Sequence, residues 1–453
     1  MNKKRSAFSG KIGYVLSAAG ASVGLGNIWR FPYLAAKYGG GIFLLVYIIL
    51  ALTFGYTMIV AESALGRMTR KSPVGAFRSF AKGKKVGWLS FGGWINAIIP
   101  VLIVPYYSVI GGWVVKYLFE YIRGNGNKLA EDGYFSGFIS NGGATEICFV
   151  IFCMFTLVII YAGVQNGIER VSKIMMPILI VLSVIIAIYS VTRPGAIEGV
   201  KYFLVPNVKN FSWMTVVAAM GQMFYSLSIA MGILVTFGSY MRKDTSIEDS
   251  TRNVEIFDTA IAMMAGLMII PAVFAFSGGD PDTLQAGPSL MFITIPKVFA
   301  NMGFGTAVGI LFFVLVLFAA VTSSIALTES AVSTFEDELG WGRKKATILT
   351  GVIMIALGTL SCLGYGPLDF VKIIGMQFLD FFDFLTNSVM MPIAALMTSL
   401  LVSRVIGVDK IEEEIRHGES AFRRKKIFVV MIKYLCPIFA LIILASSVAN
   451  AFG

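Results

Sequence analysis

The sequence GASVGLGNIWRFPY, residues 20–33, lies inside the first long apolar segment of the chain and decides how the fold is interpreted. It places three glycines and the polar side chain of Asn27 where a membrane helix ordinarily carries leucine. Small residues let neighbouring membrane helices pack closely, so helix packing is one explanation. Asn27 favours a second, because non-helical backbone at membrane depth is tolerated where it is buried in protein or lines a cavity. The stretch therefore predicts either a tightly packed helix or a helix interrupted at its centre.

The rest of the chain has the composition of a membrane protein. Of its 453 residues, 57% are hydrophobic and 14% are charged, with a mean hydropathy of +0.78, whereas soluble proteins carry about 25% charged residues. Apolar runs of about 20 residues, enough to cross a bilayer, recur without two-residue alternation, which favours helices over a β-barrel. The sequence predicts an all-α polytopic membrane protein with eleven spans. They are placed at residues 12–35, 41–66, 89–120, 146–163, 174–192, 213–238, 256–277, 303–334, 346–363, 376–403 and 427–451.

The formal net charge of +11 is distributed unevenly along the chain. With the N-terminus placed in the cytoplasm, 26 of the 37 Lys and Arg residues fall in the N-terminal segment and the cytoplasmic loops. Cytoplasmic loops are enriched in these residues, so we expect a cytoplasmic N-terminus and, after eleven spans, an external C-terminus. The basic loops then face anionic lipid rather than nucleic acid. A cleaved signal peptide is not expected, because Lys11 interrupts the early apolar region and apolar sequence continues far beyond it.

The sequence contains no constellation of residues typical of an enzyme or a metalloprotein. The cysteines Cys148, Cys153, Cys362 and Cys436 lie in or beside apolar spans without zinc spacing, so we expect them to be buried small residues. His417, the single histidine, lies in a charged loop. No glycine-rich nucleotide loop follows a strand, and no nucleophile accompanies a base. We therefore expect a protein that is not an enzyme.

A second apolar span carries polar interruptions like those of the first. GQMFYSLSIAMG, residues 221–232, contains Gln222, Ser226 and Ser228 and lies five spans further along. Interrupted spans in corresponding positions of two halves are typical of secondary transporters built as inverted repeats, with the substrate at the membrane midplane. We expect a single transporter domain. Its three parts are a first repeat (spans 1–5), a second repeat (spans 6–10) and the last span, at residues 11–193, 211–403 and 425–453 of 1–453.

Two more apolar spans contain groups suited to a cation. Thr322 and Ser323 lie in AAVTSSIAL, residues 319–327. Their hydroxyls either bond back to their own helix or offer oxygen to a hard cation such as Na⁺. Asp258, in EIFDTAIAMMAG, either caps the start of span seven or lies within it. An ionised carboxylate at a span centre costs about 2.5–3.5 kcal/mol on insertion scales, so there it indicates a functional site.

Taken together, these segments resemble the neurotransmitter:sodium symporter family. GLGNIWRFPY, NGIER, GQMFYSLSIAMG, SYMRKD, VTSSIA and FEDEL occur in the order of the family and extend the resemblance over nearly the whole chain. The resemblance implies the fold of the bacterial leucine transporter, in which spans 1 and 6 are unwound at their centres. It also implies that Na⁺ moving down its gradient drives amino-acid import by alternating access.

The resemblance further implies two sodium sites, each built mainly from neutral oxygen atoms. The first would also use the carboxylate of the bound amino acid. Its residues would be Ser22, Asn27, Ser226 and Asp258. The second would combine backbone carbonyls with two hydroxyls, from Gly20, Val23, Ala319, Thr322 and Ser323.

The implied substrate site lies between the two interrupted spans. The substrate carboxylate would meet the backbone amides of Leu25 and Gly26 and the hydroxyl of Tyr107. Gly24 stands where monoamine carriers of the family have Asp, which indicates a substrate with its own carboxylate. No charged side chain faces the pocket, so we expect a neutral, mainly hydrophobic or aromatic amino acid. The implied binding residues are Ala21, Ser22, Gly24, Leu25, Gly26, Ile103, Tyr107, Tyr225, Ser226, Ser228, Ala230, Met231, Ser323 and Leu327.

Two ion pairs would gate this site in members of the family. Arg30 and Asp383 match the outer pair. Arg5 and Asp337 match the inner pair, with Tyr240 beside it. An exposed ion pair contributes under about 1 kcal/mol, which suits a contact that breaks in every transport cycle.

Asp258 also bears on chloride. Animal relatives bind chloride near Tyr47, Gln222, Ser226 and a serine whose position is taken here by Ala262. Many relatives have Asn where this chain has Asp258. Because the fixed carboxylate could supply the negative charge, we expect no chloride requirement.

Departures from the animal members suggest a prokaryotic protein. The chain lacks their long second external loop with its cysteine pair, and it has eleven expected spans where many relatives have twelve. We expect a multi-pass protein of a prokaryotic plasma membrane (a cell inner membrane), present as a monomer or weak homodimer without a nucleic-acid partner. An H⁺-coupled carrier that uses Asp258 and a non-transporting amino-acid sensor are the alternatives to Na⁺-coupled import.

Overall fold

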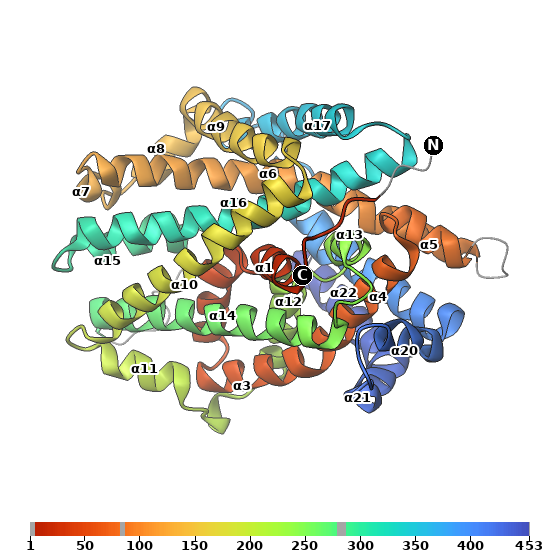
Figure 1. Cartoon of the computed structure of the whole chain (residues 1–453). Coiled ribbons are helices and arrows are strands. Elements are labelled where there is room, and N and C mark those ends of the chain that lie inside the picture. Colours follow the sequence, from red (N-terminus) through yellow and green to blue (C-terminus); the bar gives the residue numbers. More distant parts are fainter. Residues whose placement is uncertain (1–4, 82–86, 279–286, 453) are drawn as a thin grey trace.

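The computed structural model describes residues 5–81, 87–278 and 287–452, and over these residues the chain is almost entirely helical (Figure 1). Within them, nine segments are long and apolar enough to cross a membrane. They are Gly41–Thr69, Gly87–Ile122, Gly142–Tyr161, Val164–Val191, Ile247–Ser277, Gly305–Glu338, Arg343–Leu363, Phe378–Ile406 and Lys425–Ala449. This confirms the expected all-helical, polytopic membrane protein.

Five of the nine segments consist of more than one helical element. Their elements are α3 (Gly41–Leu50), η2 (Ala51–Gly55) and α4 (Tyr56–Thr69); η3 (Gly87–Ser90) and α6 (Phe91–Ile122); η4 (Val164–Glu169) and α10 (Arg170–Val191); α18 (Phe378–Asp383), η8 (Phe384–Met390), α19 (Met391–Leu400) and η9 (Leu401–Ile406); and α21 (Lys425–Val430), η10 (Met431–Leu435) and α22 (Cys436–Phe452). The other four are single helices: α9 (Gly142–Tyr161), α14 (Ile247–Ser277), α16 (Gly305–Glu338) and α17 (Arg343–Leu363).

The two remaining expected spans are the interrupted ones. The first consists of α1 (Lys11–Ser22), η1 (Gly26–Arg30) and α2 (Phe31–Lys37). The second consists of α12 (Trp213–Ser226) and α13 (Ile233–Tyr240). Both segments are broken near the middle, as the polar residues of the sequence predict.

Short helices lie between the long segments. They are α5 (Pro73–Ala81), α7 (Gly126–Leu129), α8 (Tyr134–Ser140), α11 (Ala196–Leu204), η5 (Val208–Asn210), η7 (Leu290–Thr294), α15 (Ile295–Ala300) and α20 (Val408–Arg416). α20 is fastened to the end of α4, because Arg67 Nε lies 2.6 Å from Glu414 Oε1 and both side chains are buried.

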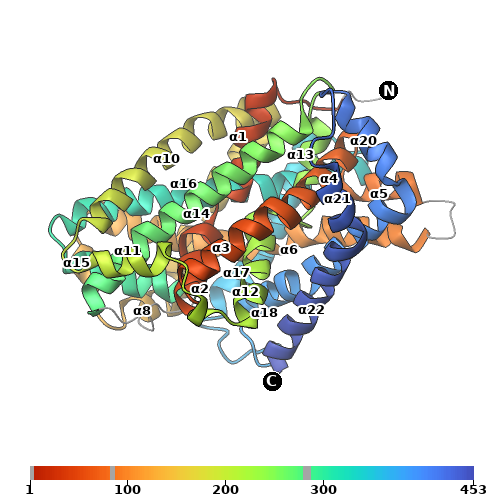
Figure 2. The ribbon, with the colours of Figure 1, turned by 90° about the horizontal axis from the view of Figure 1, so that it is seen from below.

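The broken helices are enclosed by the long ones. α16 packs along α6, and α1 packs against α10, α14 and α16, so the first interrupted segment lies inside the bundle (Figure 1). α12 packs on α3, and α13 packs on α4. α21 and α22 run along one edge of the bundle (Figure 2). The bundle therefore surrounds the two breaks with protein rather than lipid.

The two breaks differ in their backbone. In the first, Val23 leaves the helix in an extended conformation (φ −78°, ψ 96°). In the second, Ser228, Ala230 and Gly232 all have left-handed φ values, of 53°, 59° and 70°. This conformation costs a residue other than glycine about 1–2 kcal/mol. The second break therefore needs support from its surroundings.

Side chains bind the backbone groups that the breaks release. Glu62 Oε1 accepts a hydrogen bond from Ala230 N at 2.9 Å, and Glu62 is fully buried in α4. Gln222 Nε2 donates to the Gly26 carbonyl at 2.9 Å. An unpaired backbone group away from water is costly, so these contacts stabilise the unwound segments.

The glycines of the opening stretch serve close packing as well as the break. Only Gly24 lies in the unwound part, whereas Gly20 is in α1 and Gly26 begins η1. A Cβ atom at Gly24 would lie 2.5 Å from Ser323 Oγ, and one at Gly26 would lie 2.4 Å from Tyr225 Cδ1. Both explanations of the sequence therefore apply.

Candidate functional site

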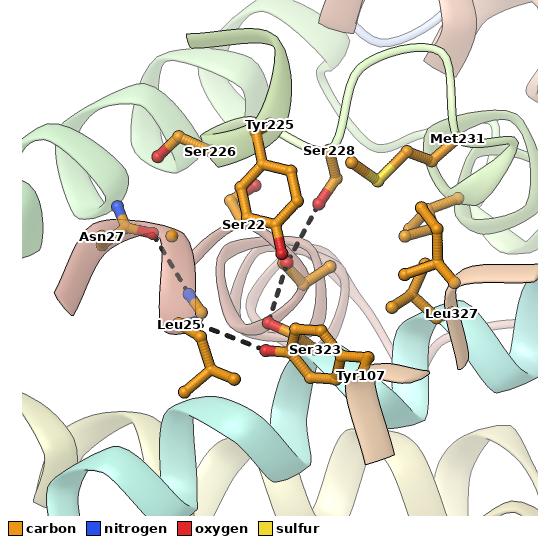
Figure 3. Close-up of a pocket in the computed structure, with 15 residues that line it drawn as sticks. Ser22, Leu25, Asn27, Tyr107, Tyr225, Ser226, Ser228, Met231, Ser323 and Leu327 are labelled. Atoms are coloured by element: carbon orange, nitrogen blue, oxygen red, sulfur yellow. Dashed lines mark hydrogen bonds between the residues drawn. The ribbon is translucent and has the colours of Figure 1, made fainter. Parts of the chain in front are cut away.

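A cavity lies between the two breaks, inside the bundle (Figure 3). Its volume is about 20 Å³, room for about one water molecule. Tyr225 and Ser228 enter from one side and Tyr107 and Ser323 from the other. The lining residues are Ala21, Ser22, Gly24, Leu25, Gly26, Asn27, Ile103, Tyr107, Tyr225, Ser226, Ser228, Met231, Ile233, Ser323 and Leu327.

One expected residue does not line the cavity, and one lining residue was not expected. Ala230 is buried with its amide on Glu62 and is absent from the lining. Its left-handed backbone is the reason, since it turns the chain differently from a continuous helix. Ile233 joins the lining as the first residue of α13. The sequence carried no signal for this position, because the restart of the helix directly after Gly232 depends on backbone geometry.

The first group of oxygen atoms converges on Asp258. Asn27 Nδ2 and Ser226 Oγ donate to Asp258 Oδ1 at 2.8 and 2.7 Å, and the Tyr47 hydroxyl donates to Oδ2 at 2.7 Å. All four side chains are at most 1% exposed. Three donors on one carboxylate suit its charged form. Asp258 lies well inside α14, which begins at Ile247, so it does not cap that helix.

Ser22 is not hydrogen-bonded to this group. Its hydroxyl donates to the Ala18 carbonyl at 3.1 Å, within α1, although Ser22 lines the cavity. Asn27 uses its other amide atom as well, because Asn27 Oδ1 accepts from Gly24 N at 3.2 Å. Asn27 thus connects the broken backbone to Asp258.

The second group of oxygen atoms surrounds Ser323 on α16. Ser323 Oγ lies 3.4 Å from the carbonyls of Gly20 and Val23 and 3.2 Å from that of Ala21. These carbonyls belong to the end of α1 and the break, where the helical ladder no longer uses all of them. The group contains no charged side chain.

Thr322 takes part in the second group through its own helix. Its hydroxyl donates to the carbonyls of Phe318 and Ala319, at 3.0 and 3.2 Å. The back-bonding explanation of this residue therefore holds in the structure. Thr322 still faces the last turn of α1, because a Cβ atom added at Gly20 would lie 3.2 Å from the Cβ atom of Thr322.

Neither group resembles a transition-metal site. Within residues 5–81, 87–278 and 287–452, no set of three or more His, Cys, Asp and Glu side chains is placed to hold a metal ion. The two groups offer one carboxylate and several neutral oxygens, which are the donors that hard cations prefer.

The cavity also offers groups for a carboxylate. Leu25 N donates to the Tyr107 hydroxyl at 3.4 Å, at the point where the unwound backbone turns into η1. The rest of the lining is mostly apolar, and none of its side chains carries a charge. These groups are suited to the carboxylate and the uncharged side chain of a small zwitterion, but at about 20 Å³ the cavity has to widen before one can enter.

A second, larger cavity adjoins the first. Its volume is about 440 Å³, and Tyr225 lines both cavities. Its other lining residues are Trp29, Arg30, Tyr33, Leu34, Tyr106, Ile110, Gly287, Pro288, Tyr365, Leu379, Asp380 and Asp383. Tyr225 therefore separates the small cavity from a wide approach.

The two expected gate pairs are in different states. Arg5 Nη1 lies 2.6 Å from Asp337 Oδ1, and the Arg5 guanidinium lies over the Tyr240 ring at 5.0 Å. Arg30 and Asp383 line the larger cavity, but within the described part of the chain they form no ion pair. Arg30 instead lies over the Tyr225 ring at 5.3 Å.

Asp383 has other partners. It accepts hydrogen bonds from the Tyr106 hydroxyl at 3.1 Å and from Asn387 Nδ2 at 2.6 Å. In this structure the Arg5–Asp337 ion pair is formed, whereas Arg30 and Asp383 are not paired with each other.

Comparison with known proteins gives relatives across almost the whole length. Residues 5–127 and 134–452 match the family described as "Sodium:neurotransmitter symporter family". An uncharacterized sodium-dependent transporter of Bacillus subtilis, YhdH, is 36% identical over 91% of each chain. One from Haemophilus influenzae is 32% identical over 98% of this chain and 99% of its own.

A more distant relative and a solved structure are also similar to this chain over most of its length. The human sodium- and chloride-dependent GABA transporter 2 is 26% identical over 91% of this chain and 75% of its own. The crystal structure of MhsT in complex with L-phenylalanine superposes with a TM-score of 0.87 and 36% identity, covering 98% of this chain and 100% of the other.

Proposed function

Because this chain belongs to the sodium:neurotransmitter symporter family, which consists of transporters and not enzymes, we propose that it is a Na⁺-coupled symporter importing neutral, hydrophobic or aromatic amino acids. One observation carries the proposal. The cavity between the two broken helices is lined by residues of two oxygen groups and by apolar side chains. A zwitterion bound there would lie beside both cation sites.

The substrate class follows from the walls of the cavity. Ile103, Met231, Ile233 and Leu327 would contact the side chain of the substrate, and none can compensate a charge. The similarity to MhsT, which was crystallised with L-phenylalanine, supports an aromatic substrate. Because the cavity holds about 20 Å³, we expect Tyr225 and Met231 to move when an aromatic side chain enters.

Two Na⁺ ions would accompany each substrate. The first would bind Asn27, Ser226 and Asp258, with Ser22 rotating away from Ala18 to join them. The second would bind the carbonyls of Gly20, Val23 and Ala319 and the hydroxyls of Thr322 and Ser323. Asp258 supplies the fixed negative charge at the first site, so we propose that transport needs no chloride.

Alternating access would use the two ends of the bundle. The five spans that begin with α1 and the five that begin with α12 would form an inverted repeat, with Arg5 on the cytoplasmic side and the C-terminus outside. The Arg5–Asp337 pair then closes the inner side. Formation of the Arg30–Asp383 pair would close the outer side after substrate binds, and the inner pair would break next.

The experiment is uptake of a panel of labelled amino acids into proteoliposomes, first with an inward Na⁺ gradient and then with choline replacing Na⁺. Accumulation of phenylalanine, tyrosine, tryptophan or leucine only with the Na⁺ gradient is the expected result. Equal uptake without Na⁺ at fixed pH would point to H⁺ coupling through Asp258 and contradict the proposal. Na⁺-dependent binding without accumulation would indicate a sensor. Gluconate in place of chloride should leave uptake unchanged.

A further inference from the structure

Three basic residues fall inside the expected spans, and transport explains only one of them. Arg30 lies beside the substrate cavity. Lys116 pairs with Glu120 within α6, at 2.5 Å. Lys433, in η10, is exposed and has no ion pair or hydrogen bond with any residue that the structure describes. A cation on the outside of a membrane helix calls for a partner outside the chain.

Lys433 lies on the apolar outer face of its helix. Val430, Tyr434 and Ile438 share this face, and each is about half exposed or more (50%, 60% and 49%). η10 belongs to the last apolar segment, at the edge of the bundle (Figure 2). In a membrane this face contacts lipid, where a lysine buries its stem among acyl chains and extends its ammonium group to the headgroups.

The helix length places Lys433 at the boundary of the hydrocarbon layer. From Tyr434 to Phe452 the chain is helical, a length of roughly 28 Å at 1.5 Å per residue. The hydrocarbon core of a bilayer is about 30 Å thick. If this stretch crosses the core, Lys433 lies at the level of the lipid phosphates. An exposed tyrosine next to it is typical of the same level.

Two more unpaired cations accompany Lys433. Lys426 lies seven residues earlier on the same helix face, about 10 Å along the axis, and is exposed. Arg404 is exposed on η9, which packs against η10. Neither has a hydrogen bond or an ion pair with the described residues. The nearby acid Glu412 is engaged by Lys425, at 2.6 Å.

We propose that Arg404, Lys426 and Lys433 form a binding site for one phospholipid with a negatively charged headgroup. The phosphate lies among the three cations, and an acyl chain lies along Ile438 and Leu441, which are exposed on the part of the helix that crosses the hydrocarbon core. A zwitterionic lipid fits less well, because its own cation would face three others. A second copy of the chain fits poorly too, since a twofold axis here would place like charges opposite each other.

The lipid site does not depend on the proposed transport function. Only its assignment to the cytoplasmic leaflet of the membrane rests on the proposed topology. The test uses the full-length protein in mild detergent, with native mass spectrometry to count bound lipid. Phosphatidylglycerol and phosphatidylcholine of identical acyl chains are added in equal amounts. We expect one phosphatidylglycerol to be retained in preference to phosphatidylcholine. Each cation removed should weaken the preference about fivefold.

The variants are Lys433→Gln and the triple change Arg404→Gln, Lys426→Gln and Lys433→Gln. Lys433→Arg keeps the charge and should keep the lipid. Lys209→Gln, in the exposed short helix η5 and far from Lys433 in the sequence, removes the same charge and should change nothing. Equal thermal unfolding in lipid-free detergent establishes that the triple variant is folded; if it is not, Lys433→Gln alone decides.

Three results would overturn the proposal. Unchanged phosphatidylglycerol retention in the triple variant, or in Lys433→Gln where the triple variant does not fold, would place the lipid elsewhere. Displacement of the lipid by soluble glycerol phosphate at equal concentration would mean that a free anion, not a lipid, fits the site. A shift from dimer to monomer in the triple variant, with no loss of lipid, would assign the face to a second copy.

Discussion

The two oxygen groups beside the cavity would use opposite means to attract the same kind of ion. The first has a fully buried carboxylate, Asp258, held by three donors from three other elements. The second has no charged side chain and gathers carbonyls from the end of α1 around Ser323. The charge of Asp258 would make the first group bind a cation strongly, but an empty site leaves that charge buried without a cation. The second group would bind a cation with backbone carbonyls that become free where α1 ends. The difference teaches that a broken helix can replace a charged residue.

Asp258→Ala tests the charged group most severely and should have the largest effect. It removes the carboxylate and leaves Asn27, Tyr47 and Ser226 without their acceptor, a loss of about 3 kcal/mol. We expect Na⁺-driven uptake to fall about 100-fold. The measurement is initial uptake in proteoliposomes, with protein amount and thermal unfolding as controls for folding. Uptake within threefold of the parent would refute the assignment of this group to Na⁺.

Asp258→Asn keeps the shape of the side chain and removes only its charge. We expect uptake to fall about tenfold in gluconate, since roughly 1.4 kcal/mol corresponds to a factor of ten. Added chloride should restore most of the activity, because Tyr47, Gln222 and Ser226 remain to bind an anion. The parent protein, measured in both anions, is the control. A variant that is equally slow with and without chloride would show that the charge of Asp258 is not interchangeable with that of an anion.

Ser323→Ala tests the neutral group. Losing one hydroxyl oxygen, worth about 1 kcal/mol, should raise the Na⁺ concentration for half-maximal uptake about fivefold and leave the chloride response unchanged. Ser324→Ala is the matched control, because Ser324 is adjacent and fully buried but its hydroxyl pairs with Thr156 at 3.2 Å. Equal Na⁺ dependence in the two variants would remove Ser323 from the ion site.

Tyr47→Phe should have the smallest effect. Its hydroxyl holds Asp258 in place in the structure, at 2.7 Å, and would hold it again when Na⁺ is bound. The contact is therefore made in both states, and only the difference between them affects ion affinity. We expect about a twofold change in half-maximal Na⁺ in chloride-free medium. A change larger than that of Ser323→Ala would mean that Tyr47 acts in only one of the two states.

Much of this site could be predicted from the sequence because its residues are polar and occur in segments that are otherwise apolar enough to contact lipid. Asn27, Gln222 and Asp258 are too polar for an apolar helix, and the structure buries all three beside the breaks. Most predicted spans match the observed helices within a few residues, because continuous apolar runs leave few alternatives. Two begin earlier than predicted: α14 begins at Ile247 rather than at residue 256, and the segment Val164–Val191 begins ten residues before the predicted start at 174. Polarity at membrane depth thus identifies both the fold and the site.

Other features depend on backbone geometry that residue types do not encode. Alanine at position 230 indicates a small pocket residue, yet its left-handed backbone leaves it outside the lining and gives its amide to Glu62. Ile233 lines the cavity because α13 begins at this residue, directly after the break. The Arg30–Asp383 pair depends on conformation: both residues line one cavity, but Arg30 lies over Tyr225. A sequence carries no information on which state of a moving contact is populated.

Tyr225, which lines both cavities, has a consequence for the kinetics of the transport cycle. If passage from the wide cavity to the small one needs only a turn of this side chain, that step is much faster than the collective helix motions, because exposed side chains rotate in picoseconds to nanoseconds and helices move in microseconds to milliseconds. Substrate binding would then reach equilibrium before each carrier movement. In that regime the half-saturation constant for uptake equals the dissociation constant of the substrate, because release is much faster than translocation. The half-saturation constant would differ from the dissociation constant only if the rotation of the Tyr225 ring became as slow as the helix motions.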